Sequence, residues 1–150
     1  MKEIFERILL LKGSDVFSQA STEDLRAVAQ ALELELYTAG DRIFSIDDQG
    51  DHMYIIQTGQ VGISTNPDPK AKDYVVVLGP GDAFGEMNLI DELPRSATAY
   101  VIEDAEILAL EKARLRRLII EYPELSLGML KSLSLRLRRM TRLQQEKSAN

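Results

Sequence analysis

Turn signals recur about every ten residues through the middle of the chain, and this spacing limits the folds open to it. Five clusters of Gly, Asp, Asn or Pro interrupt residues 34–82, and the apolar residues between them follow a period of two, as at Leu34 and Leu36. Short strands joined by tight turns at this spacing are typical of an antiparallel sandwich or barrel. The pattern predicts further strands at residues 54–57, 61–64, 74–78, 98–102 and 107–110.

Helical spacing flanks this region on both sides. The first dozen residues predict an amphipathic helix that ends at Gly13, and Ser21 with Asp24 predicts the capped start of a second helix. After Glu111 the helical period returns, and beyond Pro123 it steps by 3, 4 and 3 residues through Leu130, Leu133, Leu137 and Met140. We therefore expect a mainly β fold with flanking α-helices in a single domain, residues 1–150. It comprises N-terminal helices (1–32), an antiparallel β-roll (33–111) and C-terminal helices (112–147).

Composition excludes several kinds of chemistry. Cysteine is absent and His52 is the only histidine, which argues against metal sites, thiol nucleophiles and a Ser-His-Asp triad. We accordingly predict no metal site. The longest apolar runs, such as Ile8–Leu11 and Tyr74–Leu78, are too short for a signal peptide or a membrane span. These features predict a cytoplasmic protein without direct membrane insertion.

Charge is distributed unevenly along the chain. Residues 1–111 hold 8 basic and 21 acidic side chains, whereas residues 112–150 hold 10 basic and 3 acidic ones. An acidic body argues against nucleic acid as a partner, because that affinity comes from neutralising phosphates. We interpret the basic tail as a solvated helix face that complements the acidic body.

The segment 79–98 combines an acidic and a basic side chain near glycine. Gly85 and Glu86 begin an expected short helix, whose N-terminal N–H groups favour an anion. Arg95 adds a planar fork suited to phosphate oxygens, while the Glu86 carboxylate can accept hydrogen bonds from a hydroxyl. A cyclic phosphate fused to a ribose presents an anion and a hydroxyl side by side, so one ligand of this class satisfies both residues.

This segment resembles the phosphate-binding cassette of the cyclic-nucleotide-binding domain family, which includes protein kinase A regulatory subunits and catabolite activator proteins. The family motif is matched by Phe84, Gly85, Glu86, Leu89, Pro94, Arg95, Ser96, Ala97 and Thr98. The resemblance implies a jelly-roll-like β-roll, or double-stranded β-helix. It also implies that Glu86 binds the ribose 2′-hydroxyl and Arg95 the cyclic phosphate. By the same resemblance, Gly85 and Met87 supply backbone N–H groups, and Ser96 and Thr98 contact the phosphate or the base edge. One departure is Asp47, near which the family commonly has glycine.

The resemblance implies a sensor and not an enzyme, with no catalytic residue. Such a sensor would bind cAMP or, less favoured, cGMP, and would need no other cofactor. Its C-terminal helix would close as a lid and relay binding to a partner or a fused domain. A homodimer through Leu133, Leu137 and Met140 is a further expectation.

Two alternatives from other classes remain at this stage. One is a ligand-independent interaction or dimerisation module with a vestigial site, in which Arg95 and Glu86 pair with each other. The other is a metal-dependent enzyme on a related double-stranded β-helix, which the single histidine disfavours.

Overall fold

The computed structural model describes residues 2–71 and 73–149, which form two compact units. One unit runs from Ala31 to Arg117, and the other combines the chain up to Gln30 with the chain from Leu118. No helix within the described residues is long and apolar enough to cross a membrane. Each unit has its own arrangement of elements.

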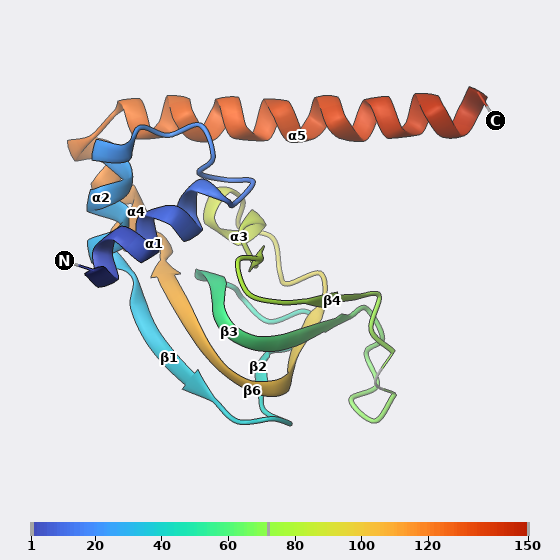
Figure 1. The fold of residues 1–150 in the computed structure, drawn as a ribbon. Coiled ribbons are helices and arrows are strands. Elements are labelled where there is room, and N and C mark those ends of the chain that lie inside the picture. The colour runs from blue at the N-terminus through green and yellow to red at the C-terminus, as the bar shows by residue number, and fades with distance from the viewer. Residues whose placement is uncertain (1, 72, 150) are drawn as a thin grey trace. The chain divides into compact units, whose positions relative to one another are not determined.

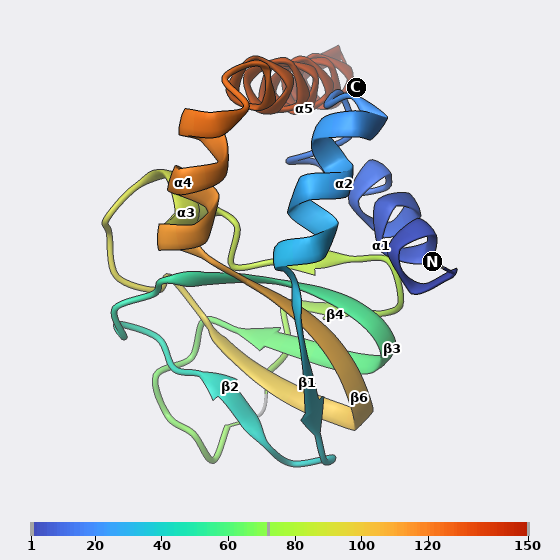
Figure 2. The same ribbon diagram turned by 90° about the vertical axis from the view of Figure 1, so that its left-hand side faces the viewer.

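The unit from Ala31 to Arg117 is an antiparallel β-roll, which confirms the predicted fold (Figure 1). Its strands are β1 (Glu33–Tyr37), β2 (Arg42–Phe44), β3 (His52–Ser64), β4 (Val76–Leu78), β5 (Ala83–Phe84) and β6 (Thr98–Glu111). The main order is β1-β6-β3-β4, while β2 pairs with β6 and β5 pairs with β3. Figure 2 shows β1 alongside β6, where it pairs with the C-terminal half of that strand.

Two long strands replace four predicted short ones. β3 contains both 54–57 and 61–64, and β6 contains both 98–102 and 107–110. The predicted turn at Thr58-Gly59 is instead an irregularity inside β3, where the register with β6 shifts and Gly59 has φ 94°. A bulge of this kind bends a strand without ending it, so both halves stay paired with the same neighbour.

The interior of the roll is apolar. Its buried members come mainly from β3 and β6, and they are Tyr54, Ile56, Val61, Phe84, Ala99, Val101, Ala105, Ile107 and Ala109. Small residues of β6 lie opposite larger ones, as at the pair formed by Ala109 and Tyr54. This core supports the strand ends from which the candidate site is built.

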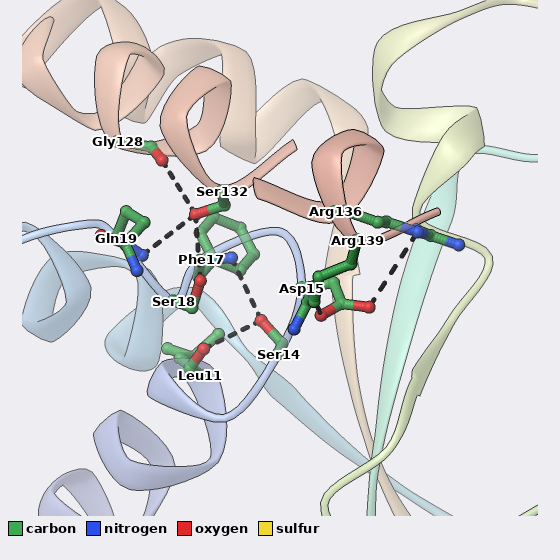
Figure 3. Close-up of polar contacts among 10 residues, drawn as sticks. All are labelled: Leu11, Ser14, Asp15, Phe17, Ser18, Gln19, Gly128, Ser132, Arg136 and Arg139. Carbon is green, nitrogen blue, oxygen red and sulfur yellow. Dashed lines mark hydrogen bonds and ion pairs between the residues drawn. The ribbon is translucent and has the colours of Figure 1, made fainter. Parts of the chain in front are cut away.

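The other unit contains the helices α1 (Lys2–Lys12), α2 (Thr22–Ala31) and α5 (Glu124–Ala149), and α4 (Lys112–Glu121) spans the division between units. The Ser21 hydroxyl accepts a hydrogen bond from the Asp24 N–H at 3.1 Å, which confirms the predicted cap of α2. The loop after α1 contacts α5 through a buried hydroxyl: the Ser132 Oγ accepts from the Gln19 N–H at 3.0 Å and donates to the Gly128 carbonyl at 2.9 Å (Figure 3). From Leu137 to Ser148, every side chain of α5 is exposed.

Candidate functional site

The predicted cassette runs from the end of β5 through α3 (Met87–Ile90) to the start of β6. Backbone hydrogen bonds fix its far end, because the Arg95 N–H donates to the Asp48 carbonyl at 2.8 Å and the Arg95 carbonyl accepts from the Asp47 N–H at 2.8 Å. Arg95 is therefore attached to the turn after β2, more than forty residues earlier in the chain. That attachment directs its side chain inward.

Arg95 is 4% exposed, and its side-chain hydrogen bonds all go to neutral oxygens. Nη1 donates to the Gly85 carbonyl at 3.2 Å and to Asn88 Oδ1 at 3.0 Å, and Nη2 donates to the His52 carbonyl at 2.8 Å. The buried Nε has no hydrogen-bond partner. Within residues 2–71 and 73–149 Arg95 forms no ion pair, so the pairing with Glu86 expected for a vestigial site is not found there.

An aromatic surface lies beneath the guanidinium. Its carbon Cζ is 4.0 Å from the ring centroid of Phe44 and 5.9 Å from that of Tyr54. The Tyr54 and Phe84 rings stack with centroids 5.2 Å apart. The faces of aromatic rings carry partial negative charge and so stabilise a cation without neutralising it.

Two glycines leave room for the guanidinium. A Cβ on Gly50 would overlap the Arg95 Nε and Cζ atoms, and one on Gly85 would lie 2.6 Å from Nη1. Gly85 also has φ 75°, a conformation that side-chain-bearing residues rarely adopt. Any larger residue at either position would displace Arg95.

Burial lowers the pKa of Arg95, because desolvation disfavours its charged form. Tyr54 and the carboxylates of Asp51, Asp48 and Glu86 act in the opposite direction. Desolvation is the larger effect. The surrounding groups therefore compensate only in part for the hydration that the buried guanidinium has lost. An anion placed against Arg95 would lower this electrostatic cost.

The other predicted site residues fall into different environments. Phe84 is buried in the core, Glu86 is partly buried just before α3, and Met87 and Ser96 are exposed. Thr98 is buried, and its Oγ1 accepts a hydrogen bond from the Ile46 N–H at 2.8 Å. Because α3 has only four residues, its dipole is small, and the attraction for an anion rests mainly on Arg95.

Sequence reasoning missed three contributors to the site: Asn88, Gly50 and Phe44. Asn88 lies in the predicted cassette, but its contact with Arg95 depends on how α3 folds back. Gly50 and Phe44 reach Arg95 only because the turn after β2 pairs with the cassette, and no local pattern encodes that pairing. The one available signal was Gly50 itself, because a glycine near the start of a strand often marks a place where another group packs closely against the backbone.

Comparisons with known proteins identify the family of the chain. The model of the family described as "Cyclic nucleotide-binding domain" matches residues 34–122, more than half of the chain, and the chain belongs to this family. The "Cyclic AMP receptor protein" of Thermus thermophilus is 34% identical over 128 residues, covering 85% of this chain and 59% of its own length. The chain thus spans less than two thirds of the length of this relative.

Two solved structures share the fold. The N-terminal domain of a transcriptional regulator from Streptomyces coelicolor superposes with a TM-score of 0.79 at 25% identity, covering 89% of this chain and 93% of that one. The regulatory domain of Toxoplasma gondii PKA, crystallised with cAMP, superposes with a TM-score of 0.71 at 26% identity, covering 78% and 44%. The family resemblance seen in the sequence is confirmed.

Proposed function

We propose that this chain is a cAMP sensor without catalytic activity, in which Arg95 binds the cyclic phosphate and Glu86 the ribose hydroxyl. The observation that carries the proposal is the buried Arg95, whose Nε lacks a partner and whose other contacts are all neutral. A buried cation in this state is stabilised by a singly charged anion. The names of the Thermus thermophilus and Toxoplasma gondii proteins support cAMP over cGMP as the ligand.

Isothermal titration with cAMP and cGMP tests this proposal. We expect the unchanged chain to bind cAMP more tightly than cGMP, and Arg95→Ala to weaken cAMP binding by about 2 kcal/mol or more, because a hydrogen bond between charged groups is lost. Arg26→Ala is the matched control, since it removes the same charge from an exposed position on α2. Equal affinity in Arg95→Ala and the unchanged chain would refute the assignment of the phosphate site.

We further propose that α5 relays binding to a partner or a fused domain. A ligand can shift a helix only by as much as its affinity differs between the helix's two positions. The relay therefore requires that cAMP bind more tightly when α5 occupies one of those positions.

We propose, as a second candidate, that α5 also joins two copies of the chain. Of the predicted seam, Leu137 and Met140 are 64% and 54% exposed, whereas Leu133 is half-buried. Leu130, which is 62% exposed, precedes Leu137 by seven residues and so extends the spacing of a coiled-coil seam. Apolar side chains repeated along one helix face are stabilised when a second such face covers them. This observation favours a homodimer, with or without nucleotide.

Sedimentation velocity with Leu137→Glu tests the dimer. We expect the unchanged chain to sediment as a dimer and Leu137→Glu as a monomer, because two buried carboxylates would face each other at the seam. Leu135→Glu is the control, since it lies about 200° further round the helix and is also exposed. A monomeric unchanged chain would rule out the seam as a dimer contact, and a dimer with no affinity for nucleotide would favour the ligand-independent module.

A further inference from the structure

Asn88 connects Arg95 to the end of the cassette loop. This α3 residue is 7% exposed, its Oδ1 accepts from Arg95 Nη1 at 3.0 Å, and its Nδ2 donates to the Leu93 carbonyl at 2.7 Å. An amide has one accepting end and one donating end, and here each end meets a group of the opposite kind. The reverse orientation would place two donors together, so the contacts fix the side chain in one orientation.

The contact with Asn88 accounts for one donor of Arg95, and the remaining hydrogen bonds show which donor of the guanidinium lacks an acceptor. Both hydrogens of Nη1 have acceptors, one being Asn88 Oδ1 and the other the Gly85 carbonyl. The N–H of Nε, which has no partner, shares an edge of the guanidinium with Nη2. Nη2 donates one of its two hydrogens to the His52 carbonyl at 2.8 Å. In general, an edge formed by Nε and the other Nη2 hydrogen can donate in parallel to two oxygens of one phosphate.

We infer that Asn88 is a positioning residue: it holds Nη1 of Arg95 so that the Nε–Nη2 edge receives the anionic group of the ligand. The inference rests on the proposed function and adds to it a residue that acts through Arg95 and not on the ligand. The Leu93 contact extends this role, because it ties the orientation of the arginine to the loop between α3 and β6.

A neutral acceptor suits this role better than a charged one. A carboxylate at position 88 would also accept from Nη1, but it would form an ion pair with Arg95 and compete with the ligand's phosphate. Gly50 leaves room for the amide, because a Cβ there would lie 2.8 Å from Asn88 Cγ. The site thus provides orientation while leaving the arginine charge for the ligand.

Titration calorimetry with cAMP on Asn88→Ala and Asn88→Asp tests the inference. We expect Asn88→Ala to raise the Kd about tenfold, as loss of one hydrogen bond to a charged group would. Asn88→Asp should raise the Kd at least as much while the melting temperature of the ligand-free protein stays at or above that of Asn88→Ala. Asn66→Ala is the control, because Asn66 Oδ1 also accepts a hydrogen bond, from the Asp68 N–H at 2.9 Å, in a loop remote in sequence from the cassette. Its Kd should change less than twofold.

Repeating the Asn88→Ala measurement in the Arg95→Lys variant distinguishes a positioning role of Asn88 from a general effect on stability. Arg95→Lys keeps the charge but lacks the guanidinium fork, so adding Asn88→Ala to it should change the Kd less than threefold. If Asn88→Ala raises the Kd by the same factor in the Arg95→Lys background as in the unchanged chain, the role of Asn88 is overturned. An Asn88→Ala Kd within twofold of the unchanged chain would also overturn it. Both results would leave the proposed function intact. Affinities of the position-88 variants that merely follow their melting temperatures would also overturn the role of Asn88. Failure of the unchanged chain to bind any cyclic nucleotide would overturn both.

Discussion

Asp47 adopts a backbone conformation that usually requires glycine. Its φ is 72°, and no other non-glycine among the described residues has a positive φ. The left-handed conformation is unfavourable for a residue with a side chain, although aspartate tolerates it better than most. The turn that holds Arg95 therefore has the backbone conformation that a glycine at position 47 would allow. Having aspartate there costs conformational free energy but does not change the shape of the turn.

Replacing Asp47 by glycine should accordingly stabilise the roll. We expect Asp47→Gly to raise the free energy of unfolding by up to about 1 kcal/mol, since relief of the left-handed strain outweighs the extra entropy of the unfolded chain. Urea unfolding measures this difference. Asp48→Gly is the matched control and should be destabilising, because Asp48 Oδ2 accepts from the Ser45 N–H at 2.9 Å. A similar loss in both variants would mean that the Asp47 side chain itself stabilises the turn.

At the same scale, the sequence identifies candidate site residues but not the contacts that hold them. Arg95 and Glu86 follow from residue type and spacing, whereas the acceptors of Arg95 are two backbone carbonyls and Asn88. Every residue has a carbonyl, so no residue pattern marks the ones that the fold directs inward. The aromatic residues Tyr54, Phe84 and Tyr100 are 8%, 5% and 6% exposed, which agrees with the general preference of β-sheets for aromatic side chains.

At the scale of elements, apolar periodicity predicted the strands but not always their buried side. Leu34 and Leu36 in β1 are 47% and 74% exposed, while Tyr37 packs against the core. The Tyr37 hydroxyl donates to Glu35 Oε1 at 2.6 Å, so the inner side of β1 carries a satisfied polar pair. Successive side chains of a strand point to opposite faces of its sheet, and alternation alone cannot tell which face the interior of the roll covers.

The attachment of α5 to the loop after α1 also belongs to this scale. Ser132 is fully buried and hydrogen-bonds to both Gln19 and Gly128 (Figure 3). We expect Ser132→Ala to lower the free energy of unfolding by about 1–2 kcal/mol, because the Gln19 N–H loses its acceptor. Thermal unfolding of this variant beside Ser134→Ala, an exposed serine of the same helix, provides the comparison. Equal stability of the two variants would show that the loop holds α5 by packing alone.

For the whole molecule, the central question is whether binding in one unit is transmitted to the other. Arg95 and Asn88 belong to the unit from Ala31 to Arg117, whereas the whole of α5 belongs to the other unit. Binding alone stabilises whichever unit holds the ligand, by about 2.7 kcal/mol at a ligand concentration of 100 times Kd. Stabilisation confined to that unit would make the chain a binding protein, and only a change in the second unit would make it a sensor.

Hydrogen exchange read by mass spectrometry separates these two cases. We expect saturating cAMP to slow amide exchange in residues 84–98, and also to change the exchange of α5, because a relay requires that the ligand bind one state of that helix more tightly. Arg95→Ala at the same cAMP concentration should show neither effect, since it lacks the phosphate contact. Slower exchange in the cassette with α5 unchanged would retain the nucleotide site and refute the relay. The output would then have to arise from the cassette or its neighbouring surface, without involving the C-terminal helix.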